Sequence, residues 1–115
     1  MIRGMHGLLY SPNPDELREF IRDKLGFPFT DIGGGWLIFE VPEADLGCHP
    51  AETSFHSISF YCDDIEQSVA ELKSRGVEFT SGITEESWGF LTHFRAPGNM
   101  EFELYQPKYE KKKNA

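Results

Sequence analysis

Two histidines 50 residues apart and two closely spaced glutamates are the residues of this sequence best suited to metal or proton-transfer chemistry. His6 and His56 each precede a segment of alternating apolar residues, and Glu101 and Glu103 lie near the end of the chain. Two imidazoles and a carboxylate suit a divalent transition metal with positions left for water and substrate. Zn, Fe, Mn and Ni all remain candidates, because ligand type alone does not choose among them.

The two glutamates are expected to share one face of a strand. At ~3.4 Å of rise per residue, Glu101 and Glu103 would lie roughly 7 Å apart, which is too far for comfortable sharing of one metal. One carboxylate would then be a ligand and the other a catalytic base. The structural alternative is that both simply face outward from a half-exposed strand. His49 is a further candidate ligand, whereas His93 shares a face with Leu91 and is interpreted as structural.

Three aromatic residues are candidate pocket walls. Tyr10, Trp36 and Trp88 all lie beside predicted strands or within them. Aromatic walls suit an apolar or cationic ligand. The alternative is that these side chains belong to the hydrophobic core.

The segment Ser57–Phe79 would position His56, because it predicts a strand, a capped helix and a second strand. Asp63 and Glu66 have the spacing of a capping box, and Gly76 supplies the left-handed residue that ends the helix. The apolar stripe at helical spacing consists of Ile65, Val69 and Leu72.

The same pattern occurs earlier in the chain, over Met5–Phe27. Asn13 is the predicted cap, Pro14 occupies the first helical turn, and Gly26 ends the helix. Gly26 and Gly76 are 50 residues apart, as are His6 and His56. A period of this length indicates two copies of one supersecondary unit.

Three short strands are predicted after each helix, so the chain is expected to be α+β, with a βαβββ unit occurring twice. Gly33–Gly35 is interpreted as a hairpin turn, because no phosphate-binding motif accompanies it. The strands predicted after the first helix are 27–32, 36–41 and 44–49, and those in the second unit are 83–86, 88–95 and 100–106.

Length and composition fit a single domain. The chain has 115 residues, of which 39% are hydrophobic. We expect one domain over residues 1–107, with repeats at about 5–50 and 55–107, and a basic flexible tail over 108–115. Cys48 and Cys62 form no zinc motif and are expected to be reduced.

The charge distribution limits the classes of partner. Net charge is −8, and the last eight residues hold four lysines and one glutamate, so the preceding 107 residues carry −11. An acidic body argues against nucleic acid and favours cationic ligands or a carboxylate-held metal. Because no apolar run approaches the length of a membrane span or a signal peptide, we expect no membrane association and a cytoplasmic location.

The pattern resembles the vicinal oxygen chelate superfamily, which includes glyoxalase I, extradiol dioxygenases, fosfomycin-modifying enzymes and bleomycin-binding proteins. The segments that carry the resemblance are FIRDKLGF, DDIEQSVAELKSRGVEF and APGNMEFELYQP. The resemblance implies two βαβββ repeats that form a curved, mixed eight-stranded sheet around a cavity. It also implies a homodimer.

The resemblance also assigns positions for the metal ligands. His6 falls on the first ligand position and Glu103 on the last. Counting back from the second helix, the middle ligand position falls on Ser57. Counting by the 50-residue repeat, it falls one residue earlier, on His56, the partner of His6. A one-residue slip in a strand reverses the face, so this register decides whether the site exists. Ala96 stands where the family usually has Asp.

Two functions follow as hypotheses. The first is a divalent-metal-dependent lyase, isomerase or dioxygenase that acts on a small oxygenated substrate. The second is a metal-free protein that sequesters a cationic or aromatic small molecule, similar to bleomycin-resistance proteins. The paired histidines favour the first hypothesis and the acidic body favours the second.

Overall fold

The computed structural model describes residues 6–44, 47–48 and 50–110 and has an α+β architecture. Strand β3 (Ser59–Tyr61) pairs in parallel with β6 (Met100–Pro107), and the other strand pairs of the described residues are antiparallel. The elements in chain order are α1 (Pro14–Phe20), a single π-helical turn η1 (Ile21–Leu25), β1 (Phe29–Asp31), β2 (Leu37–Phe39), β3 (Ser59–Tyr61), α2 (Ile65–Ser74), β4 (Thr84–Glu86), β5 (Gly89–Ala96) and β6 (Met100–Pro107).

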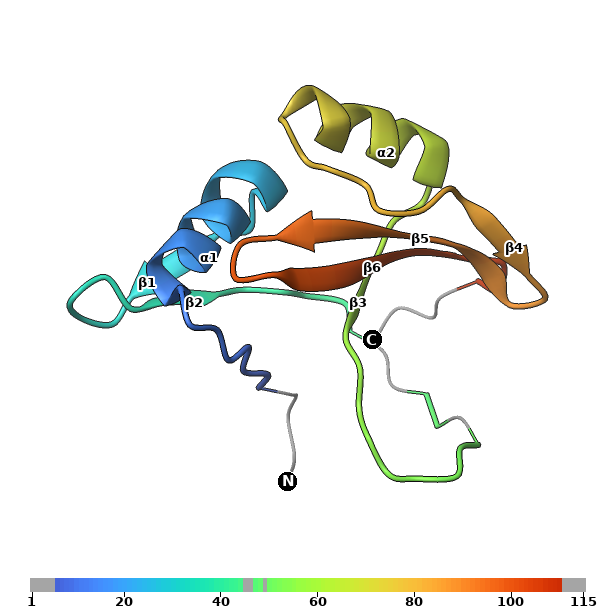
Figure 1. The fold of residues 1–115 in the computed structure, drawn as a ribbon, viewed down its shortest axis with the longest axis horizontal. Helices are drawn as coiled ribbons and strands as arrows, with labels where there is room; N and C mark the ends of the chain where they lie inside the picture. The colour runs from blue at the N-terminus through green and yellow to red at the C-terminus, as the bar shows by residue number, and fades with distance from the viewer. Residues whose placement is uncertain (1–5, 45–46, 49, 111–115) are drawn as a thin grey trace.

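The second half of the chain forms a βαβββ unit, but the strand predicted directly after the helix, at Val77–Phe79, is only an isolated bridge between Phe79 and Phe94. Its strands make one sheet in the order β3-β6-β5-β4, with α2 as the connection between β3 and β4. Both α1 and α2 lie over the same face of this sheet (Figure 1). No helix of the described residues lies on the opposite face, and we call it the helix-free face.

The expected continuous eight-stranded sheet is not what the described residues form. They contribute six strands, arranged as this four-stranded sheet and a separate β1–β2 pair. Residues 6–10, predicted as a strand, are irregular. Half of the strand predicted at 44–49 lies outside the described residues, and residues 44, 47 and 48 are irregular. Burial contributes little to the stability of the β1–β2 pair, because Leu37, Ile38 and Phe39 of β2 are only half-buried and β1 is exposed.

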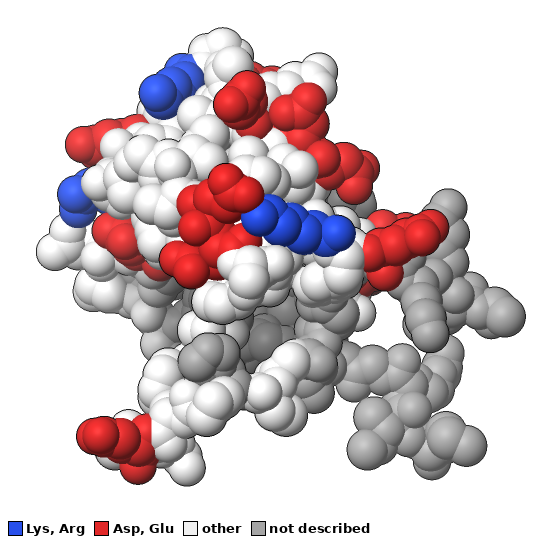
Figure 2. Space-filling model, turned by 90° about the vertical axis from the view of Figure 1, so that its right-hand side faces the viewer, with Lys and Arg blue, Asp and Glu red and all other residues white. Residues whose placement is uncertain are grey.

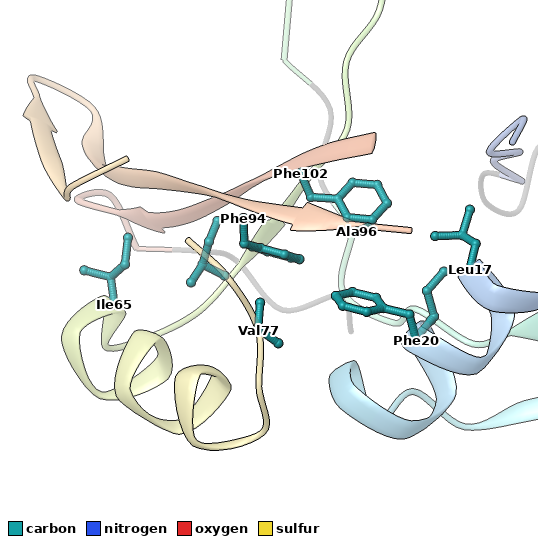
Figure 3. Packing of buried hydrophobic residues seen from close by; sticks show 9 residues of the cluster. Leu17, Phe20, Ile65, Val77, Phe94, Ala96 and Phe102 are labelled. Carbon is teal, nitrogen blue, oxygen red and sulfur yellow. The ribbon is translucent and has the colours of Figure 1, made fainter. Parts of the chain in front are cut away.

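The core lies between the helices and the four-stranded sheet. Leu17 and Phe20 approach the sheet from α1, and Ile65 approaches it from α2 (Figure 3). Phe94 lies at the centre, and its ring centroid is 5.7 Å from that of Phe102. Helices from both halves of the chain thus share one core, formed by Leu17, Phe20, Ile21, Ile65, Val77, Phe94, Ala96, Phe102 and Leu104.

Both helices end as the repeat predicts. Gly26 and Gly76 have φ of 77° and 86°, in the left-handed region that favours glycine. The predicted start of α2 is wrong by one residue: Asp64, not Asp63, is the N-cap, and its carboxylate accepts from the Gln67 N–H at 3.1 Å.

Within the described ranges, neither helix has the length and apolar run that crossing a bilayer requires.

Candidate functional site

The polar and aromatic side chains of the helix-free face are arranged by strand register. Phe94, Phe102 and Leu104 point toward the helices, so alternate residues of the same strands point away from them. Residues directly opposite one another in a register share a face. The helix-free face therefore carries three cross-strand rows: Arg95 with Glu101, then His93 with Glu103 and Ser59, then Leu91 with Tyr105 and Tyr61.

A histidine–carboxylate pair occupies the central row. His93 Nε2 lies 3.7 Å from Glu103 Oε1, and each side chain is about one-third exposed, at 34% and 35%. On its other side the imidazole Nδ1 lies 3.2 Å from the Ser81 hydroxyl, which also accepts from the His93 backbone N–H at 3.1 Å. The imidazole is thus held in place by Ser81 and presents its Nε2 to the carboxylate.

The neighbouring row is aromatic. The Tyr105 hydroxyl donates to the Trp88 carbonyl at 3.0 Å, and the Tyr61 hydroxyl donates to Glu43 at 2.6 Å. A Cβ added to Gly89 would lie 2.5 Å from the Tyr105 ring, so only glycine lets the ring lie here. Both tyrosine hydroxyls are therefore fixed.

Glu101 and Glu103 place two carboxylates on the helix-free face. Glu101 is exposed, and Arg95 beside it pairs with Glu78, with Nε 3.3 Å from Oε2. Figure 2 shows acidic side chains gathered on the side of the molecule near β4, with few lysines or arginines among them. A cationic ligand would experience favourable long-range attraction at this surface.

Of the predicted catalytic and metal residues, the structure brings Glu101 and Glu103 to the helix-free face. His6 and His56 are exposed and lie in irregular segments. His49 lies outside the described residues. Across the described residues, His, Cys, Asp and Glu side chains form no group of three or more that could hold a metal ion. The predicted ligand set is therefore not assembled by the residues that the structure places.

The three predicted pocket aromatics are largely solvent-exposed. Tyr10 is 84% exposed, and Trp36 and Trp88 are about half exposed. The Arg18 guanidinium covers part of the Trp36 ring, 4.9 Å from its centroid. Trp88 adjoins the helix-free face through its carbonyl, which accepts from the Tyr105 hydroxyl and from the Lys108 N–H.

Sequence reasoning missed His93, which it interpreted as structural. The missing information was the register of the last hairpin. A three-residue connection, Pro97–Asn99, joins Ala96 to its partner Met100, and this register places His93 opposite Glu103. Gly98 and Asn99 both have positive φ, at 82° and 60°, which suits the turn that the sequence predicts at residues 96–99.

The family model for the glyoxalase/bleomycin resistance protein/dioxygenase superfamily matches residues 5–104, which is most of the chain. The chain belongs to this superfamily. The vicinal oxygen chelate resemblance is thereby confirmed, together with the glyoxalase-like α+β fold. No curated relative matches the sequence.

Several solved structures share the fold of this chain. TnmS3, an antibiotic binding protein from Streptomyces sp. CB03234, is 22% identical with a TM-score of 0.67, over 94% of this chain and 100% of that one. A superfamily member from Sphaerobacter thermophilus DSM 20745 is 24% identical, with a TM-score of 0.63 over 91% and 98% of the two chains. Lactoylglutathione lyase from Agrobacterium tumefaciens is 16% identical, with a TM-score of 0.62 over 85% and 88%.

Proposed function

We propose that this glyoxalase-superfamily protein binds a cationic aromatic small molecule on its helix-free face, without a metal ion. The observation that carries the proposal is the juxtaposition of the His93–Glu103 pair with the tyrosine row of β3 and β6. The antibiotic-binding neighbour TnmS3 supports this reading at the level of fold.

The central row and the aromatic row of the helix-free face would each contact a different part of such a ligand. The Glu103 carboxylate, only one-third exposed, would pair with the positive charge. The Tyr61 and Tyr105 rings would contact the aromatic part and attract its charge through their π faces. With both hydroxyls already bonded, the tyrosines would act through their rings.

Proflavine, a planar aromatic cation, is a suitable probe. Its binding, measured by fluorescence in the presence of EDTA, is expected to weaken about tenfold in Glu103→Gln, because a charge-assisted contact is lost. Glu66→Gln is the matched control, since it makes the same charge change on exposed α2. Affinity should also fall as salt is added. Equal affinity in both variants, or insensitivity to salt, would contradict the proposal.

A second candidate, a metal-dependent enzyme, rests on the 50-residue spacing of His6 and His56. A divalent ion would polarise vicinal oxygens of a substrate, with His6, His56, Glu103 or His49 as ligands and Glu101 as the base. This candidate requires donors that the described residues do not bring together. Elemental analysis decides it: about one equivalent of metal, lost in His6→Ala, would establish the ion.

A homodimer is the assembly that we propose for this protein. Large apolar side chains of the first unit are exposed, among them Phe29, Ile32 and Trp36 at 45%, 64% and 52%. A second copy would cover this surface and could extend the β1–β2 pair. Sedimentation equilibrium should give twice the 13.2 kDa chain mass, and a monomer at all concentrations would refute the dimer.

A further inference from the structure

A cavity of about 260 Å³ lies on the helix-covered face of the four-stranded sheet. It is bounded by Leu25 at the end of η1, by Ser68 and Leu72 of α2, and by Phe60 and Leu104 of the sheet. This is the opposite side of the sheet from His93 and Glu103, although Tyr61 of the edge strand β3 borders both the cavity and the helix-free face.

Three phenylalanine rings line the inner part of this cavity. The ring centroids of Phe27 and Phe60 are 5.5 Å apart, and those of Phe60 and Phe94 are 6.5 Å apart with an interplanar angle of 22°. Phe94 is 1% exposed, so the wall it forms is rigidly packed. Such a surface favours a flat aromatic guest in offset contact.

An internally compensated ion pair lies at the rim. Arg75 Nη2 is 2.6 Å from Glu71 Oε1, and Arg75 Nη1 donates to the Lys24 carbonyl at 2.8 Å. The Arg75 side chain thus joins the ends of η1 and α2. Among the described residues that line the cavity, Glu71 and Arg75 are the charged ones, and their opposite charges compensate each other.

The remaining polar groups of the wall are neutral. Burial raises the pKa of the Cys62 thiol, so the thiol stays protonated at neutral pH. The Ser68 hydroxyl offers a hydrogen-bond partner on the α2 side. A guest with one N–H or O–H group would find a partner here, whereas a charged guest would be desolvated without compensation.

We infer that this interhelical cavity binds a neutral, planar bicyclic aromatic molecule of about the size of indole. The volume is just below the roughly 300–1,000 Å³ of drug-sized ligand pockets, which suits a fragment-sized guest. The aromatic wall selects a flat molecule, and the charge-neutral rim selects an uncharged one.

Indole itself is the probe, in a full-length Cys48→Ser protein in which Cys62 is the remaining thiol. We expect 1 mM indole to slow labelling of Cys62 by a small maleimide at least threefold. In methyl NMR spectra it should shift the resonances of Leu25, Leu72 and Leu104. Leu72→Trp, which places an indole ring in the cavity, should weaken binding at least tenfold, while His93→Ala on the helix-free face should leave it unchanged.

A second substitution guards against misfolding of the tryptophan variant. Ser68→Leu lies on the half-buried side of α2 and should also weaken indole binding at least threefold. Unchanged Cys62 labelling together with unshifted leucine methyls would show that the cavity is only a packing gap. Binding lost in His93→Ala but retained in Ser68→Leu would assign indole to the helix-free face and overturn the inference.

Discussion

Gly89 of β5 lies where β6 leaves no room for a side chain. A Cβ at this position would lie 2.4 Å from the Gln106 carbonyl oxygen as well as against the Tyr105 ring. Gly89→Ala is therefore expected to destabilise the fold by about 1–3 kcal/mol, since neither the backbone nor the ring can move freely. Urea denaturation measures this change.

Gly82→Ala is the matched control for Gly89. A Cβ there meets nothing within 4 Å, so the free energy of unfolding should change by less than about 0.5 kcal/mol. If both alanine variants unfold at the same urea concentration, the close approach of Tyr105 and Gln106 to Gly89 is not part of the folded state.

The two cysteines differ in environment and should differ in reactivity. Cys48 is exposed, whereas burial raises the pKa of Cys62. At pH 8 we expect Ellman's reagent to label Cys48 roughly tenfold faster than Cys62, because the thiolate is the reactive species. Comparing Cys48→Ser with Cys62→Ser assigns the two rates, and equal rates would contradict the burial of Cys62.

The same shift in pKa has a consequence for stability. An unfolded thiol ionises near pH 8.5, below the pH at which folded Cys62 loses its proton. Above about pH 8.5 the thiol therefore loses its proton more readily in the unfolded state, which favours unfolding. The part of the stability that depends on this thiol is present below this pH and is lost as the pH rises. Between pH 7 and 9.5 the urea midpoint should fall further in the wild type than in Cys62→Ala.

At the scale of elements, the two helices begin differently. Asp64 caps α2 through a side-chain bond to the Gln67 N–H, whereas Asn13, the N-cap of α1, makes no such bond. Asp64→Ala should therefore cost about 1 kcal/mol. Asn13→Ala should cost less than about 0.5 kcal/mol. Thermal unfolding of the two variants tests the difference, and an equal loss would contradict the assigned caps.

Helix positions and ends were predictable because their signals are local. The stripe ending at Leu72 and the glycines at 26 and 76 act within a few residues of the backbone that they shape. Cross-strand register depends on a turn instead, so the opposition of His93 and Glu103 was missed although both residues had been assigned to strands. Orienting Glu101 and Glu103 away from the core needed only alternation and was correct.

At the scale of the whole molecule, the family and the α+β fold could be predicted, and the continuous eight-stranded sheet could not. The four-stranded sheet is held by a core that includes Phe94 and Phe102, whereas β1 and β2 contribute only exposed or half-buried residues. The local sequence pattern of a three-residue strand with little burial does not determine which strand it pairs with. Its pairing depends on distant segments or on a second chain.

We propose that the helix-free face binds an aromatic cation without a metal. The most direct test is a titration of chelator-dialysed protein with proflavine, followed by NMR of the backbone amides. We predict binding in EDTA, with shifts at His93, Glu103 and Tyr105 that Glu103→Gln weakens about tenfold. Binding that appears only after one equivalent of divalent metal is restored, or shifts confined to other surfaces, would contradict the claim.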